Sequence, residues 1–375
     1  MRFRHRDGTV VHLAYCTNVH QAEDLDGVLA QLARFGEPVR QRLGVDRLGI
    51  GLWLARPVAS ELAGDPAAVD RLKRELAARG LEVVTFNGFP YQGFHDPVVK
   101  HKVYRPDWAA PERTRYTLDL ARLLAGLLPD DAVRGSVSTL PLGWRTDWRG
   151  DGGQLAVLAK GLAEQDRPVR VAFEPEPGCV IETTAQAAAL LSEVDKEWLG
   201  VCLDACHLAV GFEDPAAALG RLEAAGLAVV KLQASAALEA AEPNDPATRA
   251  ALESFVEPRF LHQSTEGAPP GAEDLDLALA GGLPGRAPWR VHFHVPLHAD
   301  PAPPLTSTRP VLAATLTELF GGATARTDHV EVETYTWQVL PDAPADDAGL
   351  VAGIAAELDW TRRALTALGL EEVCA

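Results

Sequence analysis

Short runs of apolar and β-branched residues alternate along the chain with longer runs rich in alanine and leucine. The short runs predict buried parallel strands, and the long runs predict helices. The predicted strands lie at residues 10–15, 48–54, 81–86, 135–140, 169–173, 200–203, 228–232 and 329–333. The predicted helices lie at residues 22–43, 58–79, 112–128, 154–164, 184–195, 215–225, 310–320 and 350–368.

The order of these elements favours one fold class. Eight strand-then-helix units imply parallel pairing and predict an α/β protein, a (β/α)8 TIM barrel that spans residues 1–375 as a single domain. An open doubly wound sheet is the alternative. Its usual marker is a glycine-rich turn after the first strand. That marker is missing here, because the strand runs into Cys16-Thr17-Asn18-Val19-His20.

One connection is too long to be a plain turn. Residues 239–308 follow the seventh predicted strand and contain a predicted helix at 247–255 and a strand-like run at 289–295. They also hold four of the eleven histidines: His262, His292, His294 and His298. In a barrel, this segment would lie over the C-terminal face, where catalytic loops gather. We interpret it as a lid-like insertion, with an inert decoration as the alternative.

The charge balance limits the class of partner. The chain has 35 basic and 52 acidic residues, a net charge of −17, and one close basic cluster of Lys100, Lys102 and Arg105. An acidic surface repels phosphate backbones, so we expect no nucleic-acid partner, whereas a small anionic ligand fits the cluster. No stretch approaches the roughly 18–20 apolar residues of a membrane span. We therefore expect a small-molecule metabolite as the ligand.

The cysteines and the first residues indicate the cellular compartment. Cys16, Cys179, Cys202, Cys206 and Cys374 are scattered and odd in number, which is not the pattern of a disulfide framework. The charged beginning of the chain lacks the apolar stretch of a signal peptide. These features predict the reducing cytoplasm.

Four successive predicted strands end in oxygen-bearing side chains: Glu174, Asp204, Gln233 and Glu333. Because the strands of a barrel end at one face, we expect these groups to converge. Oxygen ligands favour Mg or Mn, and the imidazole of His207 would shift the preference toward Mn or Zn. The sequence thus predicts a divalent metal ion with these four ligands. Glu331 shares a strand face with Glu333, but Glu333 lies nearer the C-terminal end.

Further side chains near the predicted mouth of the barrel are candidates for binding substrate. Asn18 and His20 follow the first strand, and an aromatic, glycine-rich loop after the third strand leads to His95 and Lys102. A pocket wall is the functional interpretation of this loop, and a solvated loop is the alternative. The remaining candidates are His262, His294 and Trp337, for which a packing role is the alternative.

Several of these segments together resemble a known family. Residues 12–20 (HLAYCTNVH), 173–179 (FEPEPGC), 203–207 (LDACH) and 331–337 (EVETYTW) are similar to the EboE metabolite-traffic family, which is grouped with xylose-isomerase-like barrels. The strand ends also resemble those of sugar and hydroxypyruvate isomerases and epimerases. Those enzymes hold one divalent metal with a Glu, an Asp-x-x-His, a His or Gln, and a Glu. This chain departs in having Gln233, where many members have His, and in the histidines of residues 239–308.

The resemblance implies a metal-dependent isomerase or epimerase that acts on a small polyhydroxy or keto metabolite in a secondary-metabolite traffic pathway. Glu174 and Glu333 would move a proton, and His207 would orient Asp204 or the substrate. One alternative is a metal-dependent hydrolase, with His262 or His294 as additional ligands. The other is a non-catalytic protein that binds a metabolite and passes it to other proteins of the pathway.

Overall fold

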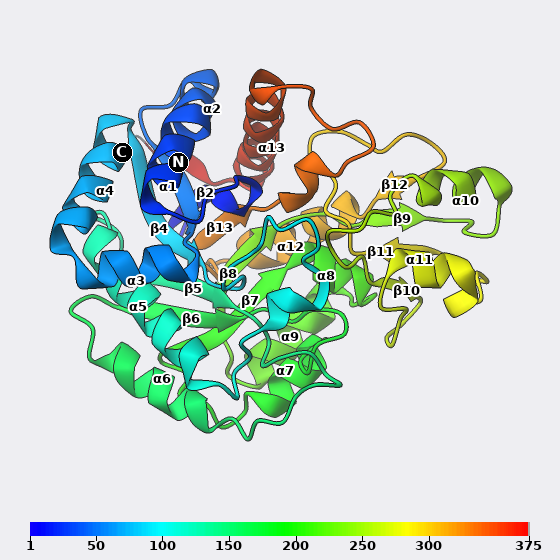
Figure 1. The fold of residues 1–375 in the computed structure, drawn as a ribbon, viewed down its shortest axis with the longest axis horizontal. Helices are drawn as coiled ribbons and strands as arrows, with labels where there is room; N and C mark the ends of the chain where they lie inside the picture. The colour runs from blue at the N-terminus through cyan, green and yellow to red at the C-terminus, as the bar shows by residue number, and fades with distance from the viewer. Residues whose placement is uncertain (374–375) are drawn as a thin grey trace.

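Eight parallel strands close into a barrel in the computed structural model, which describes residues 1–373 (Figure 1). Each strand pairs with the next along the chain, and the last pairs with both the seventh and the first, which closes the ring. The predicted (β/α)8 TIM barrel is confirmed. Its strands are β2 (Val10–Cys16), β3 (Leu48–Trp53), β4 (Leu81–Asn87), β5 (Gly135–Thr139), β6 (Val169–Phe173), β7 (Leu199–Asp204), β8 (Val229–Ala234) and β13 (His329–Val332).

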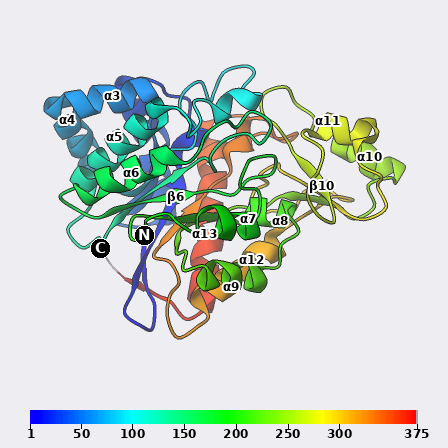
Figure 2. The ribbon, with the colours of Figure 1, turned by 90° about the horizontal axis from the view of Figure 1, so that it is seen from below.

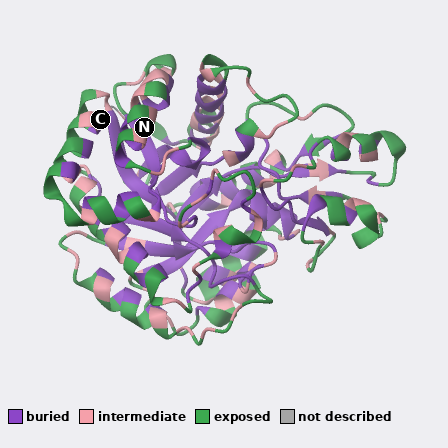
Figure 3. Cartoon of the chain, viewed as in Figure 1, coloured by how far each residue is buried: buried purple, intermediate pink, exposed green. Residues whose placement is uncertain are grey.

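Helices surround the barrel and cover its outer face (Figure 2). Their inward faces and the strands are buried, whereas their outward faces are exposed, so the core lies between the strands and the helical layer (Figure 3). The surrounding helices are α1 (Leu25–Gln31), α2 (Glu37–Leu43), α3 (Arg56–Gly64), α4 (Pro66–Ala78), α5 (Pro111–Leu127), α6 (Gly153–Ala163), α7 (Thr184–Leu190), α9 (Pro215–Ala224), α12 (Arg309–Phe320) and α13 (Asp347–Ala367). The short helix α8 (Ala205–Val210), directly after β7, is fully buried. No helix within residues 1–373 is long and apolar enough to cross a membrane.

Two of the predicted helices are each divided in two, and a different proline accounts for each division. Residues 58–79 form α3 and α4, because Pro66 begins a new helix whose N-cap, Asp65, accepts a hydrogen bond from the Ala67 N–H. Residues 22–43 form α1 and α2 with a π turn at 32–36 between them. Pro38 lacks the N–H that a continuous helix would need at that point.

A short antiparallel extension lies beside the first half of β2. It consists of β1 (Arg2–Arg4) and β14 (Glu371–Val373), with Arg4 opposite Val10 and Arg2 opposite His12. Three residues are too few to show an alternating pattern, so the sequence did not reveal these strands. Cys16, Cys179, Cys202 and Cys206 are buried free thiols. Cys374 lies outside the described residues.

Residues 239–308, here called the insertion, extend to one side of the barrel (Figure 1). They complete a four-stranded antiparallel sheet in the order β10–β11–β9–β12, with two helices at its outer end. These elements are β9 (Leu238–Ala240), α10 (Pro246–Glu253), β10 (Ser264–Glu266), α11 (Leu275–Leu277), β11 (Trp289–Val291) and β12 (Thr306–Ser307). The strand-like run expected at 289–295 leaves the sheet after Val291, and its role as a lid stays a prediction.

A buried ion pair lies inside the barrel between neighbouring strands β8 and β13. The Lys231 Nζ is 2.6 Å from the Glu331 Oε2, and both side chains are fully buried. Burial opposes the charged lysine, but the Glu331 carboxylate more than compensates and raises the pKa of Lys231. Gly51 makes room for the pair, since a Cβ there would lie 1.3 Å from the Glu331 Oε1. The Glu331 carboxylate is therefore engaged in an ion pair with Lys231.

Removing one partner of this pair is expected to destabilise the barrel strongly. Lys231→Met leaves the Glu331 carboxylate buried without a counter-charge, which costs about 3–5 kcal/mol of unfolding free energy. The double variant K231M/E331L removes both charges and should recover most of that loss. Urea unfolding of both variants measures the effect. A K231M protein as stable as the parent would contradict this account.

Candidate metal centre

Three buried carboxylates meet at the C-terminal end of the barrel. Glu174 follows β6, Asp204 ends β7 and Glu333 follows β13. An oxygen of each lies within 4.8 Å of an oxygen of the other two, and each residue is less than 5% exposed. We call these three side chains the carboxylate cluster. The sequence predicted that they would converge, and the structure places them together.

The carboxylate cluster has the chemistry of a cation site. Among residues 1–373, nothing donates a hydrogen bond to the Glu174 Oε2 or the Asp204 Oδ2, although both atoms are buried. Burial, and then the charges of Glu333 and Asp204, raise the pKa of Glu174 well above its ordinary value. Burial, and then Asp204 and Glu331, raise the pKa of Glu333 to about 8. A divalent cation would relieve this repulsion, and its preferred ligands are oxygens of this kind.

Two asparagine side chains orient the Glu333 carboxylate by hydrogen bonds. Asn18, just after β2, donates from Nδ2 to the Glu333 Oε1 at 2.6 Å. Asn87, at the end of β4, donates to the same oxygen at 2.8 Å. With Oε1 held by two donors, Oε2 is left for a cation or a proton. The sequence predicted that Asn18 would face the site but did not single out Asn87.

The Asp204 side chain is held in place because it is also the N-cap of α8. Its Oδ1 accepts hydrogen bonds from the His207 N–H at 2.9 Å and from the Ser235 Oγ at 2.8 Å. The Asp-x-x-His spacing is therefore that of an N-cap and the third residue of a helix. This short helix, which the sequence pattern did not predict, presents the His207 imidazole to the cavity.

Gln233 lies beside the carboxylate cluster but not in the cavity wall. It is opposite Asp204 in the β7–β8 ladder and opposite Glu331 in the β8–β13 ladder. The side chain is fully buried, and its Oε1 and Nε2 have no hydrogen-bond partner among the described residues. Its role as the fourth ligand stays a prediction.

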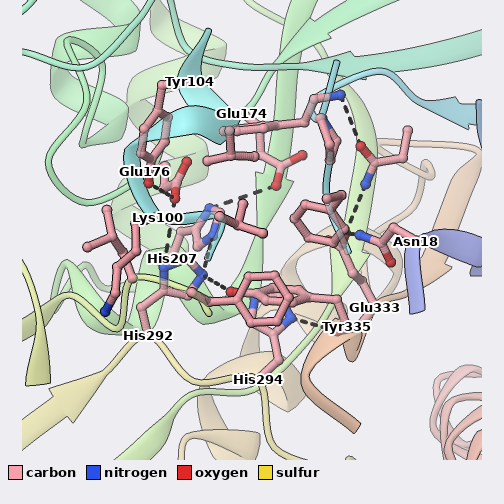
Figure 4. Close-up of a pocket in the computed structure, with 18 residues that line it drawn as sticks. Asn18, Lys100, Tyr104, Glu174, Glu176, His207, His292, His294, Glu333 and Tyr335 are labelled. Atoms are coloured by element: carbon pink, nitrogen blue, oxygen red, sulfur yellow. Dashed lines mark hydrogen bonds and ion pairs between the residues drawn. The ribbon is translucent and has the colours of Figure 1, made fainter. Parts of the chain in front are cut away.

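A second group of atoms that could bind a metal ion adjoins the carboxylate cluster. It includes two histidines of the insertion. The Nε2 atoms of His207 and His292 are 3.0 Å apart (Figure 4). His207 donates through Nδ1 to the Pro175 carbonyl, and His292 donates through Nδ1 to the Gln263 Oε1. The two Nε2 atoms face each other, and the Tyr335 hydroxyl lies 3.4 Å from the His292 Nε2. Imidazole nitrogens arranged in this way can hold a cation between them.

His294 also belongs to this second group. Its Nδ1 bonds to the Glu333 carbonyl oxygen at 2.7 Å, and its Nε2 has no partner among the described residues. Burial lowers the pKa of His294 to about 4, so the ring is neutral at pH 7 and can act as a ligand. Donor atoms of Asp204, His207 and His294 lie within 4.8 Å of one another, as do those of Glu176, His207 and His292.

The donor groups open into a cavity of about 60 Å³ (Figure 4). Its wall combines strand ends, the loop after β4 and the insertion. The lining residues are Asn18, Asn87, Phe89, Pro90, Phe94, Val99, Lys100, Val103, Tyr104, Glu174, Glu176, His207, Phe260, Leu261, His292, His294, Glu333 and Tyr335. Of the predicted substrate-binding residues, Asn18 and His294 line this cavity.

The structure places the other predicted substrate-binding residues elsewhere. His20 stacks on Phe35 with ring centres 4.2 Å apart. His95 packs against Trp53, and Lys102 is exposed, 3.9 Å from Asp96.

His262 and Trp337 also lie outside the cavity wall. The His262 Nε2 is 2.9 Å from the Glu257 Oε1, and its Nδ1 bonds to the His292 carbonyl oxygen. The Trp337 Nε1 donates to the buried Glu357. For both side chains, the contacts are those of packing and support.

Sequence reasoning missed cavity residues that depend on local turn geometry. Lys100 and Tyr104 lie on a 3-10 turn, and this turn directs Lys100 inward and leaves Lys102 in solvent. Tyr104 donates its hydroxyl hydrogen to the Glu176 Oε1 at 2.8 Å. The aromatic loop and the basic cluster were visible in the sequence, but which side chains would turn inward was not.

Comparisons with known proteins agree with the barrel. The family model described as xylose isomerase-like TIM barrel matches residues 41–256, more than half of the chain. A probable endonuclease 4 of Carboxydothermus hydrogenoformans is 29% identical over 153 residues, which are 36% of this chain and 53% of the relative. The chain thus spans about half the length of this curated relative.

Two solved structures are among those to which the chain was compared. A probable 3-DHS dehydratase from Bacillus anthracis has a TM-score of 0.49 and 14% identity, over 94% of this chain and 98% of its own. An L-ribulose 3-epimerase has a TM-score of 0.49 and 13% identity, over 96% of this chain and 95% of its own.

The affinity for a divalent metal is expected to increase with pH. Below pH 8, Glu333 must lose a proton before it can act as a ligand, because its pKa is raised to about 8. Each proton released on binding should tighten the apparent Kd for Mn²⁺ about tenfold per pH unit. Titration calorimetry between pH 6 and 8 measures the slope, and Asp204→Asn should weaken binding throughout. An affinity that does not change over this range would contradict the cluster as the site.

Proposed function

Because the chain belongs to the xylose isomerase-like TIM barrel family, we propose that it is a metal-dependent isomerase or epimerase of a small hydroxy-carbonyl metabolite. The observation that carries the proposal is the carboxylate cluster, in which the pKa of Glu174 is raised well above its ordinary value and that of Glu333 is raised to about 8. Carboxyl groups with raised pKa values beside a substrate are suited to accepting and returning a proton.

The proposed roles follow from the contacts of each side chain. A divalent ion held by Glu174, Asp204, Glu333 and Gln233 would polarise a carbonyl and an adjacent hydroxyl of the substrate. Glu333, oriented through its Oε1 by Asn18 and Asn87, would remove a proton from the carbon beside the carbonyl. Glu174, whose Oε2 has no partner among the described residues, would return one.

The positioning of His207 supports its assignment as the third catalytic residue. Its Nδ1 donates to the Pro175 carbonyl at 2.9 Å, and its Nε2 faces the His292 Nε2 in the cavity wall. A substrate hydroxyl that reaches these two rings would donate a hydrogen bond to them. The carboxylate oxygens suit Mg²⁺ or Mn²⁺, and a nearby imidazole shifts the preference toward Mn²⁺ or Zn²⁺.

The finer placement of the protein rests on its sequence. The similarity of four segments to the EboE family supports a role in the traffic of a secondary metabolite, with transfer to other proteins of that pathway. Scattered cysteines in an odd number support a cytoplasmic location. A non-catalytic carrier is the alternative, and it requires no proton transfer by Glu174 or Glu333.

One observation favours a second candidate, a metal-dependent hydrolase. The facing Nε2 atoms of His207 and His292 offer a second cation site beside the first, and two metal ions suit the activation of a water molecule. A curated relative is a probable endonuclease 4, but the net charge of −17 opposes binding of nucleic acid. Two tightly bound ions per chain would favour hydrolysis, and one would favour isomerisation.

The decisive variant for the isomerase proposal is Glu333→Gln. It keeps the shape of the side chain, and its amide oxygen can still accept from Asn18 and Asn87, but it cannot accept a proton, so exchange of carbon-bound hydrogen should fall about 10²–10⁴-fold. The measurement is NMR in D₂O with the Mn²⁺-loaded protein and a panel of ketoses and hydroxyketones.

Glu61→Gln, at an exposed position on α3, is the matched control and should keep full exchange. Thermal unfolding verifies that both variants are folded. Unchanged exchange in E333Q would refute the role of Glu333 as the base.

A further inference from the structure

The outer wall of the cavity is apolar and rigid. Five of its residues come from the loop after β4 and two from the insertion: Phe89, Pro90, Phe94, Val99, Val103, Phe260 and Leu261. The rings of Phe94, Phe260 and Tyr335, here called the aromatic wall, pack on one another with centroids 4.9–5.6 Å apart. Their ring faces offer a substrate apolar surface, and the one polar atom of the three rings, the Tyr335 hydroxyl, lies 3.4 Å from the His292 Nε2.

The cavity offers no uncommitted cation to a phosphate group. Lys100 is the one lysine or arginine that lines it within residues 1–373, and its Nζ is paired with the Asp274 carboxylate. Asp274 is itself fixed, because its Oδ1 accepts hydrogen bonds from the His262 and Leu275 N–H groups. Lys100 has a φ of +40° and donates its N–H to the Arg259 carbonyl. Backbone and side chain are thus both held in place, and Lys100 joins the β4 loop to the insertion.

Hydrogen-bonding capacity is concentrated around the carboxylate cluster. The amide nitrogens of Asn18 and Asn87 are used on Glu333, and the Tyr104 hydroxyl is used on Glu176. The buried polar atoms without partners among the cavity-lining and cluster residues include the Asn18 Oδ1, the Glu174 Oε2, the Asp204 Oδ2 and the His294 Nε2. A long polyol would place its distal hydroxyls against the aromatic wall, where they would lose their hydrogen bonds to water.

We propose that the substrate is an unphosphorylated α-hydroxyketone with a short apolar end. Its carbonyl and hydroxyl oxygens face the carboxylate cluster, and its apolar end lies against the aromatic wall. The whole cavity, of about 60 Å³, has to take both ends, so the substrate is small and its apolar end is short. The chelating end of this substrate rests on the proposed function. The apolar end rests on the aromatic wall alone.

A matched series of three hydroxymethyl ketones tests the proposal. The compounds 1-hydroxybutan-2-one, dihydroxyacetone and dihydroxyacetone phosphate share the chelating group and differ at the far end as CH₃, OH and phosphate. Calorimetry with the Mn²⁺-loaded protein should give the tightest Kd for 1-hydroxybutan-2-one, about tenfold or more below that of dihydroxyacetone, with the phosphate weakest. Phe260→Ala should reduce this preference.

A charge variant tests why phosphate is rejected. Asp274→Asn keeps an oxygen that can cap α11 but frees the Lys100 ammonium, so binding of dihydroxyacetone phosphate should strengthen about tenfold. The double variant D274N/K100M should lose this gain, and the control D274N/K102M should keep it, because Lys102 points into solvent. If D274N binds dihydroxyacetone phosphate no more tightly than the parent protein, pairing with Asp274 is not what prevents Lys100 from binding the phosphate.

The outcomes separate this inference from the proposed function. If dihydroxyacetone or its phosphate binds the parent protein as tightly as 1-hydroxybutan-2-one, or more tightly, the inference of an apolar end is wrong. This holds whatever the hydrogen exchange of the E333Q variant. Tight binding of 1-hydroxybutan-2-one with no hydrogen exchange supports the inference and contradicts the isomerase. Failure of all three ketones to bind overturns both.

Discussion

Mutual repulsion among three buried carboxylates is the constraint on which the rest of the site depends. Glu174, Asp204 and Glu333 approach within 4.8 Å in a region shielded from water. The buried Lys231 bonds to Glu331, and its charge only partly offsets the burial and repulsion that raise the pKa of Glu174 and Glu333. The fold accepts this arrangement because each carboxylate stands at a strand end, where a cation from solution can reach it. The same repulsion that opposes folding without a cation provides the affinity for one.

Support for this cluster comes from outside the barrel as well. Glu357, a buried carboxyl on α13, accepts hydrogen bonds from the Thr334 hydroxyl at 2.6 Å, the Leu297 N–H at 3.0 Å and the Trp337 Nε1 at 3.0 Å. Thr334 is adjacent to Glu333, and Leu297 follows His294 by three residues. One side chain thus joins the last helix to both segments that carry candidate ligands. Burial raises the pKa of Glu357 to about 7, although all three donors oppose the shift.

Much of the fold and the heart of the site could be predicted from the sequence, because both depend on periodic patterns. Apolar runs of strand length marked all eight barrel strands, and polar residues directly after them marked Glu174, Asp204 and Glu333. The aromatic wall and the Lys100–Asp274 pair could not be predicted. They depend on a 3-10 turn and on contacts between segments more than 150 residues apart. His20, Lys102, His262 and Trp337 show the same limit, because a residue type near a strand end does not reveal whether its side chain packs, supports or faces the cavity.

The most direct test of the account is a crystal structure of the protein soaked in Mn²⁺, with anomalous scattering used to locate the ion. The account predicts a peak between the Glu174 Oε2, the Asp204 Oδ2 and the Glu333 carboxylate, at roughly 2.0–2.4 Å from each ligating oxygen, with the Gln233 amide oxygen completing the set. A peak only at surface carboxylates, or an ordered cluster of protonated carboxyl groups bonded to one another, would contradict it.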